Sequence, residues 1–290
     1  MTNHMTAQSL QSEASRRKKG ANNAAVQIIA ILCGIIIIIP VLYCLSISFM
    51  KVSDILSRPP KVLPSELFVG NYITAWTKSR IPRYLFNSLF VSLVCSVMRI
   101  ITASLAGYGF AFMEFRGKKV LFALVLGVML IPGDVILTSN YFTISQMGLV
   151  NTYLGIMLLY FVSANNVFMM RQHFLTVSKT LREAAQIDGC SDLRFYFRIL
   201  LPISLPTLVT VFISSFISTW NMYLWPLIVA NSSNEMRTVQ IGLKMLNFSE
   251  ETSYGGTMAG AMIILIPTLV IFMLFQRKIV SGMTAGSEKG

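Results

Sequence analysis

The sequence is poor in charged residues, above all in acidic ones. Charged side chains make up 12% of its 290 residues, against roughly 25% in an average soluble domain. A soluble fold of this size has too much surface for so few charges. Hydrophobic residues account for 54% of the chain, and the mean hydropathy is +0.65. This composition excludes a disordered chain and a collagen-like fibre, and it argues against an ordinary soluble domain.

Residues that bind metals are also scarce. The two histidines, His4 and His173, stand far apart in the chain, and no two cysteines have the spacing of a metal site. The cysteines are Cys33, Cys44, Cys95 and Cys190. We expect no metal site, we exclude a small disulfide scaffold, and we interpret the cysteines as reduced packing residues.

Motifs for bond-breaking chemistry are missing. The dipeptide Gly117-Lys118 lacks both the earlier glycine and the following Ser or Thr of a phosphate-binding loop. No pair of carboxylates falls within an apolar run. We therefore expect a protein that is not an enzyme and that carries no cofactor of its own.

What the sequence does contain is long apolar runs. Crossing a bilayer as a helix takes about 20 mainly apolar residues, and six runs meet that length. They cover residues 24–50, 84–113, 120–142, 149–170, 199–230 and 255–275. Prolines within these runs are tolerated in membranes, where neighbouring helices satisfy the freed carbonyls. The sequence predicts an all-α membrane protein with six transmembrane helices, forming one domain over residues 24–277.

The net charge of +12 is spread over short blocks between the apolar runs. Such blocks favour membrane topology over nucleic-acid binding, because Lys and Arg collect on the cytoplasmic side. If the N-terminus is inside, 15 Lys and Arg residues lie on the inner side and 8 on the outer side. The pattern predicts a cytoplasmic basic tail over 1–23 and a cytoplasmic C-terminal tail over 278–290. The outer loop from Lys51 to Arg83 weakens the bias with its six basic residues.

Several polar residues fall inside the apolar runs, where polar groups are either paired or functional. We name Asp134, Asn165, Asn221 and Tyr223 as candidates for lining a substrate path. The alternative for Asp134 is a residue of a turn at the membrane interface. The alternative for the other three is hydrogen bonding between helices. Arg99, near the middle of the second run, is expected to pair with a partner subunit or to reach the cytoplasmic side.

The basic segment after the fourth run has a helix–turn–helix pattern. Leu181–Ile187 contains good helix formers, Gly189 can end that helix in a left-handed conformation, and Ser191 or Asp192 can start the next helix. Taken alone, this pattern also fits an amphipathic connector lying at the membrane surface.

This segment, residues 173–202, resembles the EAA loop of ABC importer permeases. The matching residues are Glu183, Ala184, Ala185, Asp188, Gly189, Ile199, Leu201 and Pro202. An aspartate before the glycine, here Asp188, resembles the pattern of the carbohydrate branch of that family. The stretches 148–153 and 220–227 also resemble motifs of that branch. The resemblance begins near residue 26 and extends almost to the C-terminus. The maltose-type second permease, with its glycerol-3-phosphate relatives, is the nearest type.

The resemblance implies a permease subunit of an ATP-driven, binding-protein-dependent importer for a carbohydrate, a polyol or glycerol phosphate, in a bacterial inner membrane. Its implied partners are a second permease, two ATPases that hold ATP and Mg²⁺, and an extracytoplasmic solute-binding protein. The EAA loop, between spans four and five, would dock on one ATPase through Glu183, Ala184, Ala185, Asp188 and Gly189. The basic outer loop is a candidate contact for the binding protein. A self-sufficient secondary sugar carrier is the alternative function.

Overall fold

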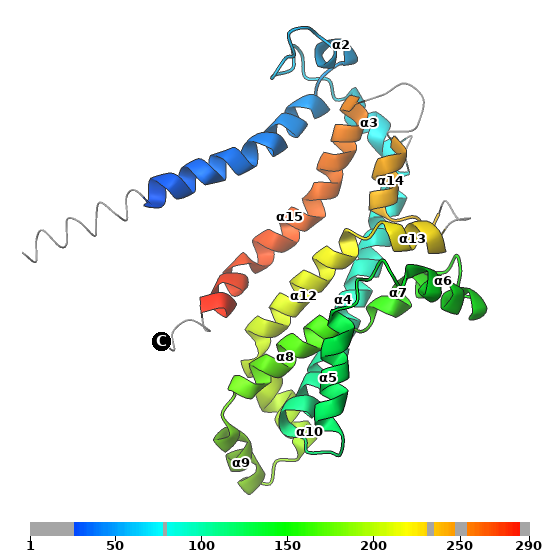
Figure 1. Cartoon of the computed structure of the whole chain (residues 1–290). Coiled ribbons are helices and arrows are strands. Elements are labelled where there is room, and N and C mark those ends of the chain that lie inside the picture. Colours follow the sequence, from blue (N-terminus) through cyan, green and yellow to red (C-terminus); the bar gives the residue numbers. More distant parts are fainter. Residues whose placement is uncertain (1–25, 78–79, 231–234, 247–253, 285–290) are drawn as a thin grey trace, which may run out of the picture.

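The computed structural model describes residues 26–77, 80–230, 235–246 and 254–284, and within these ranges it is helical without a β-strand (Figure 1). The first half contains Val26–Ser48, α2 (Val52–Ile55), α3 (Gly70–Thr77), α4 (Ile81–Phe112), α5 (Lys118–Met129) and α6 (Leu137–Gln146). The centre contains α7 (Tyr153–Met157), the 3₁₀ turn η1 (Leu158–Tyr160), α8 (Ala164–Thr176), α9 (Lys179–Ile187) and α10 (Asp192–Phe195). The last part contains the π-helical turn η2 (Tyr196–Leu200), α11 (Leu201–Ile203), α12 (Leu205–Trp220), α13 (Leu224–Val229), α14 (Val239–Leu246) and α15 (Tyr254–Thr284). The expected basic tail over 1–23 lies outside the described residues, as do residues 285–290 of the expected C-terminal tail.

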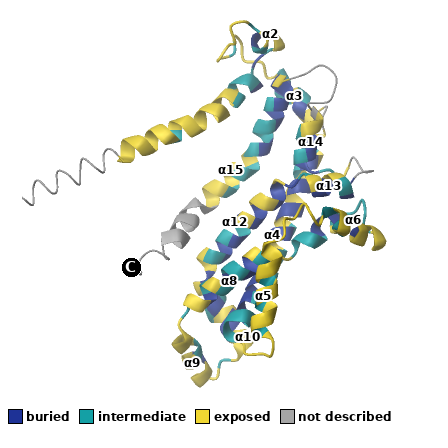
Figure 2. Cartoon of the chain, viewed as in Figure 1, coloured by how far each residue is buried: buried dark blue, intermediate teal, exposed yellow. Residues whose placement is uncertain are grey.

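The first helix, Val26–Ser48, projects away from the rest of the molecule (Figure 1). It is exposed over most of its length (Figure 2), and most of its Ile and Leu residues are among the exposed ones. Exposed apolar surface in water costs about 25 cal/mol per Å². A helix that is apolar all round is suited to hydrocarbon surroundings, as the sequence predicts for the first span.

The central element is α4, which packs against both α8 and α12. Small residues allow the close approach to α8. Ala103 is fully buried, and a Cβ added at Gly107 would lie 2.9 Å from Cβ of Met170 and 3.0 Å from the backbone nitrogen of Arg171. Small residues four apart bring helix backbones together in membranes. Ala103 and Gly107 therefore serve the close packing of α4 on α8.

By length and composition, three of the described helices can cross a membrane: Val26–Ser48, α4 and the Tyr254–Leu274 part of α15. Two bent pairs raise the number to five if each pair is one span. Tyr153–Tyr160 meets α8 at 42°, and Asp192–Ile203 meets α12 at 77°. Six spans remain a prediction.

The third predicted span differs from the expected continuous helix over 120–142. The chain forms α5 and α6 instead, separated by residues 130–136. Pro132 has no N–H to continue the helical ladder, and Gly133 is a poor helix former. Short turns replace the ladder here, with the N–H of Val135 donating to the Pro132 carbonyl at 3.1 Å. The break exposes Asp134 and sends α6 away from α5.

The segment between the first helix and α3 folds around one carboxylate. Asp54, in α2, is buried and accepts hydrogen bonds from Nζ of Lys61 at 2.6 Å, and from the backbone N–H and hydroxyl of Ser65 at 3.0 Å each. The bonds from Lys61 and Ser65 hold the pKa of Asp54 down, from 3.8 to about 2. The segment between the first helix and α3 is therefore an ordered structure around an ion pair.

We predict opposite effects for alanine at two neighbouring glycines of α4. Gly107→Ala places a methyl group against the backbone of α8 and should cost about 1–3 kcal/mol through overpacking. Gly109→Ala meets no atom within 4 Å, so it should be neutral or stabilising by up to about 1 kcal/mol, since alanine favours the helix. Thermal unfolding of the two purified variants in detergent measures both effects. Equal stability of the two variants would contradict the α4–α8 contact.

We predict that the outer loop opens in acid. A carboxyl whose pKa is lowered by folding stabilises the fold above its unfolded value of roughly 4, and this contribution is lost as the pH falls to about 2. Pepsin should therefore cleave within 55–69 readily near pH 2 and slowly near pH 4.5. Asp54→Asn should be cleaved quickly at both pH values. A pH-independent cleavage rate in the unsubstituted chain, after correction for pepsin activity, would refute the prediction.

Candidate functional site

The first candidate region is the turn between α9 and α10, where the expected helix–turn–helix is present. Gly189 has φ +74°, its N–H donates to the Gln186 carbonyl at 3.0 Å, and the N–H of Cys190 donates to the Ala185 carbonyl at 2.8 Å. This pair of bonds is the Schellman motif, which needs a residue that accepts positive φ. The Ser191 hydroxyl then accepts from the N–H of Arg194 at 3.4 Å and caps α10.

The predicted coupling residues lie on different faces of α9. Ala185 is 6% exposed and packs into the core beside Cys190. At 100° per residue, Glu183 and Ile187 point away from Ala185. Both side chains are exposed, and the exposed fraction of Ile187 is 87%. Ala184, Asp188 and Gly189 are exposed as well. The outward face of α9 therefore combines a carboxylate with an apolar side chain that has little contact within the chain.

Side chains to which the sequence analysis gave no such role fasten this loop to α4. Arg182 donates to the Phe112 carbonyl at 2.8 Å and forms an ion pair of 2.9 Å with Asp192. The Tyr108 hydroxyl donates to the Asp192 carboxylate at 3.4 Å. Deeper in, the hydroxyls of Tyr196 and Ser104 are 2.7 Å apart. The position of Arg182 on the Ala185 side of α9 is the one sequence signal that could have indicated an inward role.

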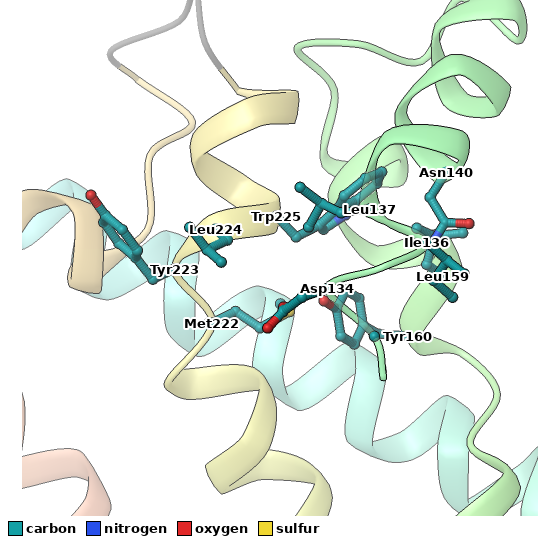
Figure 3. A pocket seen from close by; sticks show the side chains of 11 residues that line it. Asp134, Ile136, Leu137, Asn140, Leu159, Tyr160, Met222, Tyr223, Leu224 and Trp225 are labelled. Carbon is teal, nitrogen blue, oxygen red and sulfur yellow. The ribbon is translucent and has the colours of Figure 1, made fainter. Parts of the chain in front are cut away.

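The second candidate region is a cavity of about 410 Å³ formed around the broken third run. Asp134 comes from the break itself, and Tyr223 from the turn between α12 and α13. Figure 3 shows the Asp134 carboxylate beside Tyr160 and Met222, whereas the Tyr223 ring points away from Asp134. The other lining residues are Gly133, Ile136, Leu137, Asn140, Leu159, Leu224 and Trp225. Carboxylate, amide and phenol groups in one cavity can hydrogen-bond a polyhydroxylated molecule, and aromatic rings can stack on it.

The other two predicted path residues do not line this cavity. Asn165 is exposed in the first turn of α8, while its neighbour Asn166 is buried and donates to the Ser215 hydroxyl at 2.8 Å. Asn221 donates to the Ile217 carbonyl at 3.0 Å and accepts from Gln240 at 3.1 Å. Asn221 thus joins α12 to α14, the interhelical role that was its alternative.

Arg99 lies next to the cavity, because it binds the backbone of the lining residue Tyr160. It is 8% exposed and binds within the chain: Nε donates to the Tyr160 carbonyl at 2.7 Å and one terminal nitrogen to the Ser218 hydroxyl at 2.8 Å. Thr102, one turn on, donates to the Phe161 carbonyl at 2.8 Å. These carbonyls are freed where η1 ends before α8. The bent fourth predicted span and α12 thus supply acceptors for Arg99 within the chain, which the sequence analysis did not foresee.

Among the described residues no group of three or more His, Cys, Asp or Glu could hold a metal ion. Two candidate regions are thus described: the outward face of α9, and the Asp134 cavity. They lie at different levels of the molecule, and α4 runs past both (Figure 1).

Comparison with known proteins agrees with this geometry. The family described as "Binding-protein-dependent transport system inner membrane component" matches residues 99–285. The arabinooligosaccharide transport permease AraQ of Halalkalibacterium halodurans is 33% identical, over 88% of this chain and 92% of that protein. The probable ABC transporter permease YurM of Bacillus subtilis is 33% identical, over 95% and 91%. The sn-glycerol-3-phosphate permease UgpE of Agrobacterium fabrum is 33% identical, over 86% and 91%.

A solved structure shares the fold. It is a bacterial ABC transporter involved in the import of the acidic polysaccharide alginate, with a TM-score of 0.78 and 21% identity, covering 91% of this chain and 98% of that chain. The family match spans well over half of the sequence, and the relatives align over nearly their whole length. The chain is a membrane-embedded, non-enzymatic permease that belongs to the family of binding-protein-dependent transport system inner membrane components.

Proposed function

We propose that this chain forms half of the translocation path of an ATP-driven importer in a bacterial inner membrane, with both termini in the cytoplasm. Its partners are a second permease, two ATPases that hold ATP and Mg²⁺, an extracytoplasmic binding protein, and membrane lipid. The outward face of α9 is the observation that carries the proposal, because an exposed isoleucine beside a carboxylate needs a partner surface. Relatives named as transport-system permeases support it.

We assign a carbohydrate, a polyol or glycerol phosphate as the substrate class. Relatives are named for arabinooligosaccharides and for sn-glycerol-3-phosphate. The Asp134 cavity adds hydrogen-bonding groups of the kind that bind hydroxyls: the carboxylate itself, Asn140 and Tyr160. Tyr223 faces Lys244, whose Nζ lies 4.4 Å from the ring centroid. We therefore place Tyr223 at the edge of the path.

In this proposal α9 is the coupling helix. Glu183 and Ala184 contact the ATPase. Asp188 and Gly189 form the tight turn that ends α9 and directs the next segment away from the ATPase. Ala185 has a different role, because it faces the core: its small side chain seats α9 on the permease. ATP binding changes the conformation only through the different affinities of ATP for the two states of the ATPases. The helix carries that change to α4 through Arg182 and Asp192.

The outer loop is our proposed contact for the binding protein. Lys61 is engaged by Asp54 and Lys51 by Glu66, at 2.6 and 2.8 Å, so Arg58, which is exposed, is the better basic contact. A basic surface speeds capture of an acidic partner by long-range attraction. A self-sufficient secondary carrier, the alternative, has no support among the relatives.

The direct test is purification of the tagged chain in mild detergent with its membrane partners. An ATPase and a second permease should co-purify, and ATP hydrolysis by the eluate should be inhibited by vanadate. Uptake of labelled sugar or glycerol phosphate into vesicles should require ATP inside and binding protein outside. A lone chain that transports without ATP would refute the proposal.

We predict that Ile187→Asp uncouples the importer. The side chain makes little contact within the chain, so the variant should insert and fold normally. A charge in an apolar contact should reduce ATPase co-purification and ATP-dependent uptake about tenfold or more. Ile187→Leu, which keeps an apolar side chain, is the matched control and should retain most activity. Normal uptake by Ile187→Asp would remove α9 from the coupling interface.

We predict that substitutions at Asp134 change substrate affinity and leave basal ATP hydrolysis intact. Asp134→Ala should raise the KM of uptake about tenfold, in line with the loss of one hydrogen bond to a charged group. Asp134→Asn keeps a hydrogen-bond acceptor, so its KM of uptake should rise less. A secondary carrier coupled to protons would instead lose transport completely in Asp134→Asn, so uptake kinetics of the two variants separate the two functions.

A further inference from the structure

A second cavity lies away from both regions, where α4 turns into α5. Its volume is about 730 Å³. The walls are formed by the α4–α5 turn, the first turns of α5 and Arg171 of α8. The Phe112 carbonyl at the end of α4 binds Arg182 of α9, so the cavity is at the same end of the molecule as the coupling loop. That end is the cytoplasmic face in the proposed topology.

Part of the lining of this cavity is basic, and we call this part the basic end. Lys118, Lys119 and Arg171 line it together with a single acid, Glu114. Lys118 donates to the Met113 carbonyl at 2.7 Å and pairs with Glu114 at 3.3 Å, whereas Lys119 is exposed. The lining therefore keeps a formal charge excess of two positive groups, in a position suited to an anion.

Two features hold the basic end in shape. The Arg171 guanidinium lies 4.0 Å from the centroid of the Phe122 ring, and its Nε donates to the Phe110 carbonyl at 3.4 Å. Gly117, at the N-terminus of α5, provides no side chain to cap the helix. The first N–H groups of a helix favour an anion when no side chain caps them. The first turn of α5 thus adds backbone dipoles to the two lysines.

The rest of the cavity is apolar. Val120, Phe122, Ala123 and Leu126 line it, and α5 holds no buried residue along its length. Its other side chains, such as Leu121 and Leu124, are exposed too, so the apolar wall continues into an apolar surface that faces outward. A free phosphate would satisfy the basic end alone. A molecule with an anionic head and an apolar chain satisfies both parts.

We propose that this cavity binds one anionic phospholipid, with its phosphate at Lys118, Lys119 and Arg171 and an acyl chain along the apolar wall of α5. Basic pockets between helices on the cytoplasmic side are suited to lipid headgroups, and each basic residue near such a surface adds severalfold to affinity. The inference rests on the topology given in the proposed function, and it needs neither the substrate nor the ATPases of that proposal. The bound lipid would brace the α4–α5 turn, to which the coupling loop is also attached.

The test is native mass spectrometry of the full-length chain, purified in mild detergent and stripped of lipid. Phosphatidylglycerol should bind at least tenfold more tightly than phosphatidylcholine. The double variant Lys118→Gln/Lys119→Gln should lose about tenfold in phosphatidylglycerol affinity. Arg194→Gln/Arg198→Gln removes the same charge from exposed positions nearby and should lose less than about twofold.

A second variant separates a lipid from a free anion. Ala123→Trp leaves every charge in place and fills the apolar wall, so it should weaken phosphatidylglycerol binding about tenfold by occupying the place of the acyl chain. Inorganic phosphate at millimolar concentration should not displace the lipid. Displacement by phosphate together with normal binding by Ala123→Trp would assign the cavity to a free anion. Equal losses in the two double variants would mean diffuse surface attraction. Either result would overturn the proposal.

Discussion

The structure depends on how a membrane protein satisfies backbone carbonyls at a break in a helix. Hydrocarbon offers no hydrogen bonds, so each freed carbonyl needs a donor from the protein. Around η1 these donors come from distant elements: Trp225 binds the Ile156 carbonyl at 3.1 Å, Arg99 that of Tyr160 at 2.7 Å, and Thr102 that of Phe161 at 2.8 Å. The side chains of α4 and α13 thereby hold the fourth predicted span in its bent form. That bend brings Tyr160 to the cavity beside Asp134.

The same constraint explains why one charge can sit deep in α4. An unpaired guanidinium in hydrocarbon is costly, but Arg99 meets a carbonyl, a hydroxyl and the Tyr160 ring, whose centroid is 5.3 Å away. Its charge strengthens the hydrogen bonds it makes. Replacing it with an apolar residue would leave the Tyr160 carbonyl without this donor, so the arginine and the helix break require each other.

Local features of the fold followed from local sequence. The α9 helix, its end at Gly189 and the Ser191 cap depend on residues within a few positions of each other. Each of them follows from the backbone conformation or hydrogen bonding that its residues favour. The break at Pro132-Gly133 was visible in the sequence too, but apolar length outweighed it in the prediction of a continuous span. The partners of Arg99 were not predictable, since they lie 61 and 119 residues away. Asn165 and Asn221 were chosen by residue type, and which face of a helix meets a cavity depends on tertiary packing.

The two candidate regions share one element, α4. Near its end, α4 is bonded to the α9–α10 segment, through Phe112 with Arg182 and Tyr108 with Asp192. About two to four turns earlier, Arg99 and Thr102 bind the bent segment that lines the cavity. A helix transmits displacement along its axis with little loss, because each turn is bonded to the next. Under the proposed function, a movement of α9 must either break its bonds to α4 or displace α4. Displacing α4 shifts the carbonyls that Arg99 holds, and with them Tyr160. The coupling of ATP to the path therefore needs no chain of separate contacts, only the bonds at two points on one helix.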